Sequence, residues 1–500
     1  MPMTNLPDFF VLQAEGGGPF LRVVDQASGL MKFDETDVWS PRAKFAIERS
    51  KTQDLLHMNY VHIRSCFNNK YWKVKWVAAR GQPDMIYASA DEPNEEEKSK
   101  ECTGFRPLSS DIPVRLPGFR LCWISQYFYL EKNADNGNLC LSQSAGHTFP
   151  TIDWRTLLVL PSQVSFRLQV VGPDAKDYGN GGKYLCSSRV DGEPCLRFEP
   201  GVDPADTMAA YELIPTADGN YSIKDLTFGK FWRVTNFNIV ADAEERDLVH
   251  DNNTKFSPVK VSENAIALRS VGGNSFVGPA YPSPAERLCV GYPTVTTKTR
   301  LIVEERVLKK EIANVTYRLS ESKIYNEEVQ EASHSFATNN SPDKETTVTL
   351  TYSLTDSKSN NWSNSESLTL GTKVEFKTAA IPIIAKNKVE LSADFTYTHD
   401  FGSTETVETK REGSYTVVVP PLTTMKLSLM FTKALCDVPY SYTQSDSLYD
   451  GTLVSVEKDD GIYNGIMSFD FYFESIRTNL KEDGTAVEPA ERSITRTYLV

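Results

Sequence analysis

The chain lacks the sequence motifs that mark most hydrolases, metalloproteins and nucleotide-binding enzymes. It has no His-Glu-x-x-His zinc motif and no Gly-x-Ser-x-Gly nucleophile elbow, and Gly181-Gly182-Lys183 is followed by tyrosine rather than by the serine or threonine of a phosphate loop. None of its eight cysteines forms a Cys-x-x-Cys pair, which argues against zinc and redox sites. We therefore expect a protein that is not an enzyme and that holds no metal and no cofactor.

Long apolar runs and an excess of positive charge are also missing. No run approaches the roughly 18 apolar residues of a membrane helix. The formal net charge of −13 argues against nucleic acid as a partner and against attraction to anionic lipid by charge alone. The N-terminal sequence MPMTNLPDFFVLQAEGGG shows no secretory signal, and eight thiols without one fit a reducing compartment. These features predict a cytoplasmic protein that needs a receptor to reach a membrane.

One short pattern recurs six times in the first 290 residues or so. An apolar strand is followed by a turn with Gly or Asn and then by a doublet of aromatic or apolar residues. The doublets are Phe20-Leu21, Tyr71-Trp72, Phe128-Tyr129, Tyr184-Leu185, Phe231-Trp232 and Phe276-Val277. Three such units close the barrel and the hairpin cap of a β-trefoil, so six units predict two trefoils. Two β-sandwich domains of short strands are the alternative. The segment 151–161 (TIDWRTLLVLP) reads as a short helical linker between the two domains.

The sequence changes character after about residue 300. Residues 341–375 hold fourteen Ser or Thr, and strands such as TTVTLTYSLT alternate between polar and apolar side chains. This pattern is typical of an elongated antiparallel sheet with two partly solvated faces. The segment 303–312 (VEERVLKKEI) is interpreted as the first element of this third domain. We therefore predict an all-β chain with domains at 1–150, 151–298 and 299–500.

Residues 368–398 alternate between apolar and polar side chains on both sides of a short apolar tip. Membrane-spanning β-strands need about 9–11 residues with this alternation. The predicted lipid-facing residues are Leu370, Val374, Phe376, Val389, Leu391, Phe395 and Tyr397. The predicted lumen-facing residues are Lys373, Glu375, Lys377, Lys388, Glu390 and Asp394. The predicted tip is Ile381, Pro382, Ile383 and Ile384. The same alternation also fits an ordinary amphipathic hairpin that lies on a soluble sandwich.

Residues 1–295 resemble the amaranthin-type plant agglutinins, which are tandem β-trefoil lectins. The resemblance is carried, in the family's order, by stretches such as ERSKTQDLL (48–56), VHIRSCFNNKYW (61–72), TIDWRTLLVLP (151–161) and IKDLTFGKFWRV (223–234). It implies two trefoils and a preference for galactose- or GalNAc-type disaccharides. It also implies a dimer in which the first trefoil of one subunit meets the second trefoil of its partner at the sugar site.

The sugar loop departs from the pattern of this family. Residues 76–90 read WVAARGQPDMIYASA, where the family has a cluster of asparagine and aromatic residues. Sugars are usually held by an aromatic ring against their apolar face and by Asn or Asp at their hydroxyls. The candidate carbohydrate-binding residues are Trp76, Arg80, Gln82 and Asp84, with Asn236 and Asn238 from the second trefoil. Alternatively, Trp76 is a core residue and the rest of this loop is solvated.

Residues 300–500 resemble the aerolysin-type pore-forming module. The resemblance is carried by NNWSNSESLTLGTKVEFKTAAIPIIAKNKVELSADFTYTHDFG (360–402) and by VVVPPLTTMKLSLMF (417–431). It implies a ring-shaped homo-oligomer in which each protomer donates its 368–398 hairpin to a shared β-barrel. A lone hairpin cannot cross lipid, because its edges would leave backbone groups without hydrogen bonds.

Together these patterns predict a lectin-guided, membrane-targeted pore former with a role in defence. It would bind a glycan, oligomerise and insert its hairpin into a membrane. The rival hypothesis is a non-lytic multivalent cytosolic lectin that uses its C-terminal domain only to oligomerise and so to raise avidity. A protease-activated storage protein is a third, weaker interpretation.

Overall fold

The computed structural model describes residues 9–14, 16–49, 60–75, 83–96, 99–107, 119–121, 127–142, 152–169, 182–190, 192–280, 286–364, 370, 374–385, 388–392, 397–401, 404–482, 484–487 and 491–493. Within these residues the long elements are all β-strands. The remaining elements are single-turn 3-10 helices: η1 (Pro41–Ala43), η3 (Thr207–Ala209), η4 (Glu245–Asp247), η5 (Asn252–Thr254), η6 (Thr297–Thr299) and η7 (Leu319–Glu321). In this part of the chain no helix has the length and apolar character to cross a membrane. The all-β fold class is therefore confirmed.

The chain divides into two compact units. The first unit contains Met1–Lys310, Ser365–Lys373 and Ser445–Ser455, and the second contains Glu311–Asn364, Val374–Gln444 and Val456–Val500. Each unit is described by itself.

Twelve strands form the first antiparallel sheet. Their order is β3-β2-β1-β4-β5-β6-β7-β11-β10-β9-β8, and β12 pairs with β1. The strands are β1 (Phe9–Ala14), β2 (Phe20–Val23), β3 (Met31–Glu35), β4 (Phe45–Arg49), β5 (Val61–Ser65), β6 (Tyr71–Lys75), β7 (Met85–Ala90), β8 (Phe105–Pro107), β9 (Phe119–Leu121), β10 (Tyr127–Lys132), β11 (Leu139–Ser142) and β12 (Ile152–Thr156).

Twelve further strands form the second sheet. Their order is β15-β14-β13-β16-β17-β18-β19-β23-β22-β21-β20, and β24 pairs with β13 and β21. The strands are β13 (Gln163–Leu168), β14 (Lys183–Val190), β15 (Glu193–Pro200), β16 (Tyr211–Pro215), β17 (Tyr221–Asp225), β18 (Lys230–Thr235), β19 (Asn238–Ala243), β20 (Phe256–Lys260), β21 (Ala265–Ser270), β22 (Phe276–Pro279), β23 (Leu288–Tyr292) and β24 (Leu301–Glu305). Adding twelve to each strand number of the first sheet gives this order, so the second sheet repeats the first strand for strand. The tandem β-trefoil architecture is confirmed.

A buried tryptophan occupies the same place in both sheets, on β6 and on β18. Trp72 and Trp232 are both fully buried, and each is packed edge-on against two aromatic rings from equivalent strands. The ring-centroid distances are 5.0 Å from Trp72 to Phe45, 6.1 Å from Trp72 to Phe105, 5.1 Å from Trp232 to Tyr211 and 5.8 Å from Trp232 to Phe256. Edge-to-face packing of this kind stabilises a core beyond the effect of burial alone. Each tryptophan is thus the centre of its own trefoil core.

The repeated doublets of the sequence lie on the equivalent strands β2, β6, β10, β14, β18 and β22. In a regular strand two consecutive side chains point to opposite faces, so only one of them enters the core. The register shifts within four doublets, as in a β-bulge: Phe20-Leu21, Tyr71-Trp72, Phe231-Trp232 and Phe276-Val277. A bulge lets consecutive residues face the same side, and the first three of these doublets are buried at both positions. The bulges explain why these four repeats read as doublets.

The structure corrects the linker expected at 151–161. Ile152–Thr156 is strand β12, and it pairs with β1 from Phe10↔Thr156 to Ala14↔Ile152. The leucines that follow favoured a helix in the sequence, but β1 offers a strand edge that β12 covers. The segment 303–312 is likewise divided, since its first residues complete β24 and its later residues begin β25 (Val307–Tyr317). The strands that close the two sheets therefore lie beyond the boundaries drawn at residues 150 and 298.

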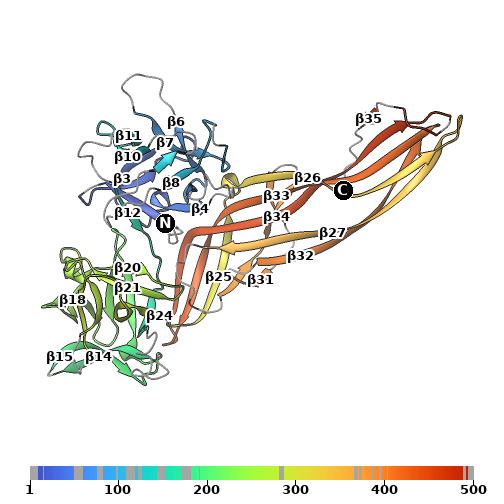
Figure 1. Cartoon of the computed structure of the whole chain (residues 1–500). Coiled ribbons are helices and arrows are strands. Elements are labelled where there is room, and N and C mark those ends of the chain that lie inside the picture. The colour runs from blue at the N-terminus through green and yellow to red at the C-terminus, as the bar shows by residue number, and fades with distance from the viewer. Residues whose placement is uncertain are drawn as a thin grey trace. The chain divides into compact units, whose positions relative to one another are not determined.

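The second unit is built on a nine-stranded antiparallel sheet. Its order is β31-β28-β25-β33-β34-β27-β32, with β26 paired to β33 and β35 paired to β34. Figure 1 shows β33, β34 and β27 as long strands lying side by side. The strands other than β25 are β26 (Lys323–Asn339), β27 (Thr346–Ser363), β28 (Val374–Thr378), β31 (Tyr397–Asp400), β32 (Thr404–Val419), β33 (Thr423–Leu448), β34 (Leu453–Asn479) and β35 (Glu491–Ser493). A separate two-stranded sheet is made by β29 (Ile381–Ala385) and β30 (Lys388–Ser392).

The Ser/Thr-rich strand β27 has one solvated face and one core face, as its alternation predicts. Thr351, Ser353 and Thr355 lie on one face of the strand and are exposed. Trp362 lies on the opposite face and is fully buried. The Trp362 indole Nε1 donates a hydrogen bond to the Tyr317 hydroxyl at 2.9 Å. Trp362 therefore anchors one end of this long strand in the core of the unit.

The cysteines in the described part of the chain are all free thiols. Burial raises the pKa of Cys140, Cys186 and Cys436 to about 12. Cys66 is only partly buried. A thiol with a pKa near 12 is roughly one ten-thousandth thiolate at pH 8, and the thiolate is the reactive form. These three cysteines are therefore structural rather than reactive.

Replacing Trp232 by alanine should destabilise the second trefoil. Loss of a fully buried tryptophan costs about 3–5 kcal/mol in the free energy of unfolding. Urea denaturation followed by circular dichroism measures this change. The control is Phe237→Ala, which removes a ring that is 75% exposed and should change stability by less than about 0.5 kcal/mol. Equal effects of the two substitutions would contradict the tryptophan-centred core.

Thiol reactivity tests the burial of the cysteines. Iodoacetamide at pH 8 should alkylate Cys66 in the native protein and leave Cys140, Cys186 and Cys436 unmodified, because their thiols stay protonated at that pH. Adding denaturant should make all four react. Peptide mass spectrometry measures the modification at each site. Rapid native alkylation of Cys436 would show that β33 is not buried as described.

Candidate pore hairpin and carbohydrate site

The predicted pore hairpin forms two successive pairs of strands in the second unit. The outer pair is β28 with β31, in a register that joins Glu375↔Asp400 and Thr378↔Tyr397. The inner pair is β29 with β30, from Ile381↔Ser392 to Ala385↔Lys388. The outer pair belongs to the nine-stranded sheet and the inner pair forms its own small sheet. The ladder is therefore broken between Thr378 and Ile381.

The four residues of the predicted tip, Ile381, Pro382, Ile383 and Ile384, lie in strand β29 of this structure, where Ile384 pairs with Val389. Their role as the tip of an inserted hairpin stays a prediction. Ala385 pairs with Lys388, and residues 386–387 between them lie outside the described residues. Isoleucine favours strands, so IPIIA folds locally as a strand. Alternation alone could not distinguish an apolar tip from a short apolar strand.

The predicted lipid-facing residues have several environments in this structure. Phe376 and Val389 are buried, Val374 is half-buried, and Leu391 is 41% exposed. Leu370 packs against the core of the second trefoil, within the first unit. Phe395 and the side chain of Tyr397 lie outside the described residues, although the backbone of Tyr397 pairs with Thr378.

Phe376 holds the hairpin to the core of the second unit. Its ring centroid lies 5.1 Å from that of Trp362, 5.9 Å from Phe401 and 6.1 Å from Tyr440. Burial of one phenylalanine contributes about 1.5–3 kcal/mol, and aromatic pairs add to it. Ile384 and Val389 of the inner pair belong to the same core cluster. In this state the apolar face of the hairpin is largely covered by the unit's own core.

The predicted lumen-facing charges point away from this core. Lys388 and Glu390 are exposed, and Glu375 and Lys377 are half-buried. The Lys377 Nζ atom lies 2.8 Å from Glu311 Oε2 and 3.4 Å from Glu375 Oε1. The hydrogen bond with Glu311, followed by the one with Glu375, raises the pKa of Lys377. Lys373 and Asp394 lie outside the described residues. In the described part of the hairpin, the charged side chains therefore lie outside the core.

The structure describes only the last two residues of the first candidate sugar loop, 83–84. Trp76, Arg80 and Gln82 lie outside the described residues, so their role stays a prediction. Asp84 is half-buried, and its backbone oxygen accepts a hydrogen bond from the Leu141 amide at 2.8 Å. This bond ties the end of the loop to β11.

The second candidate site is the turn between β18 and β19. Thr235 pairs with Asn238, and the two residues between them, Asn236 and Phe237, have φ angles of 46° and 68°. Positive φ at both central positions defines a tight type I′ hairpin turn, which normally selects Asn or Gly. Phe237 adopts this conformation with 75% of its surface exposed, and its carbonyl accepts a hydrogen bond from the Val290 amide at 2.8 Å. An aromatic ring is thus presented to solvent between Asn236 and Asn238.

Phe237 was not among the sequence candidates. The signal that could have found it is an aromatic residue inside a two-residue hairpin turn, where an aromatic side chain is unusual. The turn follows β18 just as residues 76–84 follow β6, and these strands are equivalent in the two sheets. The two candidate sugar sites therefore arise from the same position of the trefoil repeat.

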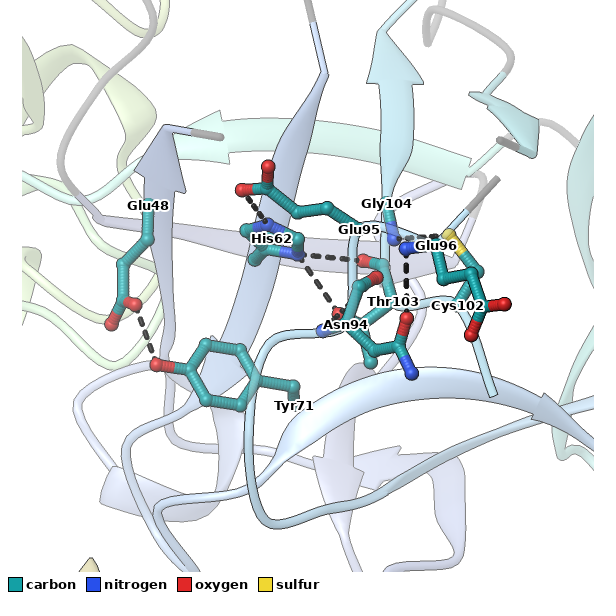
Figure 2. Close-up of polar contacts among 9 residues, drawn as sticks. All are labelled: Glu48, His62, Tyr71, Asn94, Glu95, Glu96, Cys102, Thr103 and Gly104. Carbon is teal, nitrogen blue, oxygen red and sulfur yellow. Dashed lines mark hydrogen bonds and ion pairs between the residues drawn. The ribbon is translucent and has the colours of Figure 1, made fainter. Parts of the chain in front are cut away.

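A polar cluster around the buried His62 fastens residues 94–95 and 103 to β5 (Figure 2). His62, only 2% exposed, has its Nδ1 atom 2.9 Å from Thr103 Oγ1 and its Nε2 atom 3.2 Å from Glu95 Oε1. The Asn94 amide donates a hydrogen bond to Thr103 Oγ1 at 2.8 Å. Among the described residues, no group of three or more His, Cys, Asp and Glu side chains could hold a metal ion. The cluster thus has a structural explanation in fixing this loop.

Comparison with family models gives two matches. Residues 4–142 match the Agglutinin domain, and residues 273–456 match the Aerolysin toxin family. The second trefoil lies largely between the two matches, and its assignment rests on its strand order. Both families are generally non-enzymatic. No curated protein sequence matches the chain.

Several solved structures are similar to the chain at low identity. The lamprey immune protein is 16% identical over 64% of this chain and 96% of its own, with a TM-score of 0.30. The aerolysin-like protein of Bombina maxima is 15% identical over 33% of this chain and 97% of its own, with a TM-score of 0.22. The designed three-fold symmetric protein ThreeFoil is 12% identical over 28% of this chain and 96% of its own, with a TM-score of 0.23.

The family matches agree with the resemblances found in the sequence at both ends of the chain. The protein therefore joins an agglutinin domain to an aerolysin-type region.

Proposed function

We propose that the protein binds a carbohydrate through its trefoils and forms a membrane pore with the hairpin of its second unit. The observation that carries this proposal is the two-faced character of the hairpin. Phe376 of β28 and Val389 of β30 pack in the core, whereas Lys388 and Glu390, which alternate with Val389 along β30, are exposed. A strand with one apolar and one charged face meets the requirement for lining a water-filled pore in lipid.

The proposed pore requires several copies of the chain. Every backbone donor and acceptor in the hydrocarbon layer needs an internal partner, so each protomer would contribute one hairpin to a closed ring. Glu375, Lys377, Lys388 and Glu390 would face water inside the ring, and the apolar residues would exchange their core contacts for lipid. The oligomer is a ring in the membrane and, by the agglutinin resemblance, a dimer in solution.

The proposed sugar site centres on the β18–β19 turn. The exposed Phe237 ring can stack on the apolar face of a galactose- or GalNAc-type sugar, and Asn236 and Asn238 can hydrogen-bond its hydroxyls. Such a site would bring an acidic chain to a membrane that does not attract it by charge. Trp76, Arg80, Gln82 and Asp84 remain candidates for the equivalent site in the first trefoil.

We further propose that the protein resides in the cytoplasm, acts at membranes and has no enzymatic activity. The free thiols of the described cysteines fit a reducing compartment. Binding a sugar and inserting a hairpin require only non-covalent contacts and strand pairing, and no covalent bond is made or broken.

A non-lytic multivalent lectin is the second candidate function. One observation favours it: Phe376, Ile384 and Val389 pack in the unit's own core, as they would in a domain that serves only to oligomerise. This candidate predicts glycan binding without any release of vesicle contents. It therefore differs from the pore former in a single measurement.

Dye release tests the pore. The wild-type protein should empty phosphatidylcholine vesicles that carry mixed glycolipids, and Leu391→Asp should not. Leu391 is already 41% exposed, so the substitution should preserve the fold, whereas a carboxylate in lipid costs about 3 kcal/mol per protomer. The matched control, Ser392→Asp, adds the same carboxylate on the polar face and should still release dye. Binding without release by the wild type would support the non-lytic lectin.

A glycan array tests the turn site. Phe237→Gly should weaken binding roughly tenfold, equivalent to about 1.4 kcal/mol. Glycine adopts positive φ without steric cost, so the variant should keep the melting temperature of the wild type or raise it. Asn238→Ala should weaken binding as well. The control Val249→Ala alters another exposed apolar residue of the same trefoil, 70% exposed, and should bind normally. Unchanged binding by Phe237→Gly would exclude the turn as the sugar site.

A further inference from the structure

Two arginines lie directly opposite each other in the second trefoil. Arg197 of β15 forms an isolated bridge with Arg287, the residue before β23. Both residues are partly exposed. Residues directly opposite in an antiparallel pair have neighbouring side chains, and like charges in such a pair destabilise it. The chain has a net charge of −13, so two cations brought together at one point need an explanation.

Carboxylates of the protein neutralise this pair only in part. The Arg197 Nε atom donates a hydrogen bond to Glu199 Oε1. No carboxylate of the described residues forms an ion pair with Arg287. The adjoining residues 281–285 read YPSPA in the sequence and contain no acidic side chain. The Arg287 guanidinium is therefore open to an anion from outside the chain.

The first trefoil has no such pair at the equivalent position. There Lys32 of β3 is bridged to Asn138, the residue before β11, just as Arg197 is bridged to Arg287. Strands β3 and β15 are equivalent in the two sheets, and so are β11 and β23. The repeat therefore accepts a neutral residue at this place, and the arginine pair is specific to the second trefoil.

The residue before Arg287 has a strained backbone. Glu286 has a φ angle of 40°, where the equivalent Gly137 has 75°. Positive φ suits glycine and is costly for a residue with a side chain, and such strained positions cluster at functional sites. The Glu286 Oε1 atom accepts a hydrogen bond from Lys183 Nζ at 2.6 Å. The carboxylate next in sequence to Arg287 is therefore engaged by a lysine instead.

The arginine pair lies on the same face as the proposed sugar turn. Asn238 pairs with Cys289 of β23, and Cys289 follows Arg287 by two residues. Alternate residues of a strand point to the same face and lie about 7 Å apart. The Val290 amide of β23 also donates to the Phe237 carbonyl at 2.8 Å. One strand thus holds both the turn and Arg287, close enough for a single oligosaccharide to contact both.

The buried thiol of Cys195 lies near both guanidinium groups. Cys195 precedes Arg197 by two residues on β15, so their side chains share a face. Burial raises the pKa of this thiol, and the charges of Arg287 and Arg197 act in the opposite direction. Both arginine side chains therefore act on the same small region of this face.

We propose that Arg197 and Arg287 form an anion subsite beside the β18–β19 turn, and that the glycan bound there is acidic, with a carboxylate or a sulfate group. This inference rests on the proposed sugar site and names its class of ligand. Guanidinium groups bind carboxylates and tetrahedral oxyanions through paired N–H donors. An anion between the two arginines would also remove their mutual repulsion. An acidic chain would thus recognise an acidic glycan through one local pair of cations.

Three probes with one neutral core test the subsite: lactose, lactose 3′-sulfate and 3′-sialyllactose. Isothermal titration calorimetry on the full-length protein measures the dissociation constant of each. The wild type should bind at least one charged probe roughly tenfold more tightly than lactose, because charge-assisted hydrogen bonds are the stronger ones. Added salt should reduce this preference. The two charged probes distinguish a sulfate from a carboxylate.

Arg287→Asn introduces the residue that the first trefoil has at this place, and it should bring the charged probes to the affinity of lactose. The matched control is Arg246→Asn. It removes the same charge from an arginine of the same trefoil whose side chain is 85% exposed, and it should keep the preference. Melting temperatures equal to that of the wild type show that both variants are folded.

Equal binding of all three probes by the wild type would contradict the subsite and leave the sugar site standing. The same holds if Arg287→Asn retains the preference. Inorganic sulfate that binds as tightly as lactose 3′-sulfate would reveal a site for free anions and would also overturn this inference. If none of the three probes binds, the proposed galactose-type site fails and the subsite fails with it.

Discussion

The unbroken ladder between β27 and β32 is the constraint on which the second unit depends. Its sixteen backbone pairs determine which side of each strand faces the core. They therefore place Thr351 in solvent, and they hold the two ends of the hairpin segment next to each other. Trp362, the next residue after the ladder, pairs with Tyr463 of β34 in the core. The hairpin contributes Phe376 to the ring cluster around Trp362, so the core and the candidate pore strands share the same contacts. A change in the packing of this core therefore also changes the contacts of the candidate pore strands.

Much of the architecture could be predicted from the sequence because it repeats. The doublets at Phe20-Leu21, Tyr71-Trp72 and Phe231-Trp232 gave the strand period and the two trefoils, and the structure explains them as bulges. The alternation of β27 predicted its solvated face correctly. The doublets and the alternation of β27 reflect the local environment that each residue prefers. In these elements the local preference agrees with the tertiary structure.

The sequence failed where tertiary context decides between two acceptable local structures. The leucine-rich segment after Trp154 favours a helix by composition, yet β12 forms because β1 needs a partner. The IPIIA segment forms strand β29 in this structure, which the alternation did not indicate, and its role as a membrane tip stays a prediction. Phe237 was missed because its significance lies in a positive φ angle and an exposed ring, neither of which is visible as a motif. The loop holding Trp76 departs from the family, so the resemblance could not decide its role.

The connection that carries the candidate sugar residues differs in length between the two trefoils. Nine residues (76–84) join β6 to β7, whereas two residues, Asn236 and Phe237, join the equivalent strands β18 and β19. Lengthening a loop from two residues to nine adds only about 1.3 kcal/mol of closure entropy, and neither connection interrupts the tryptophan core beneath it. A duplicated scaffold of this kind can retain one copy of a surface turn while the other copy drifts in length and composition. Evolution can then change ligand preference at this position almost independently of folding.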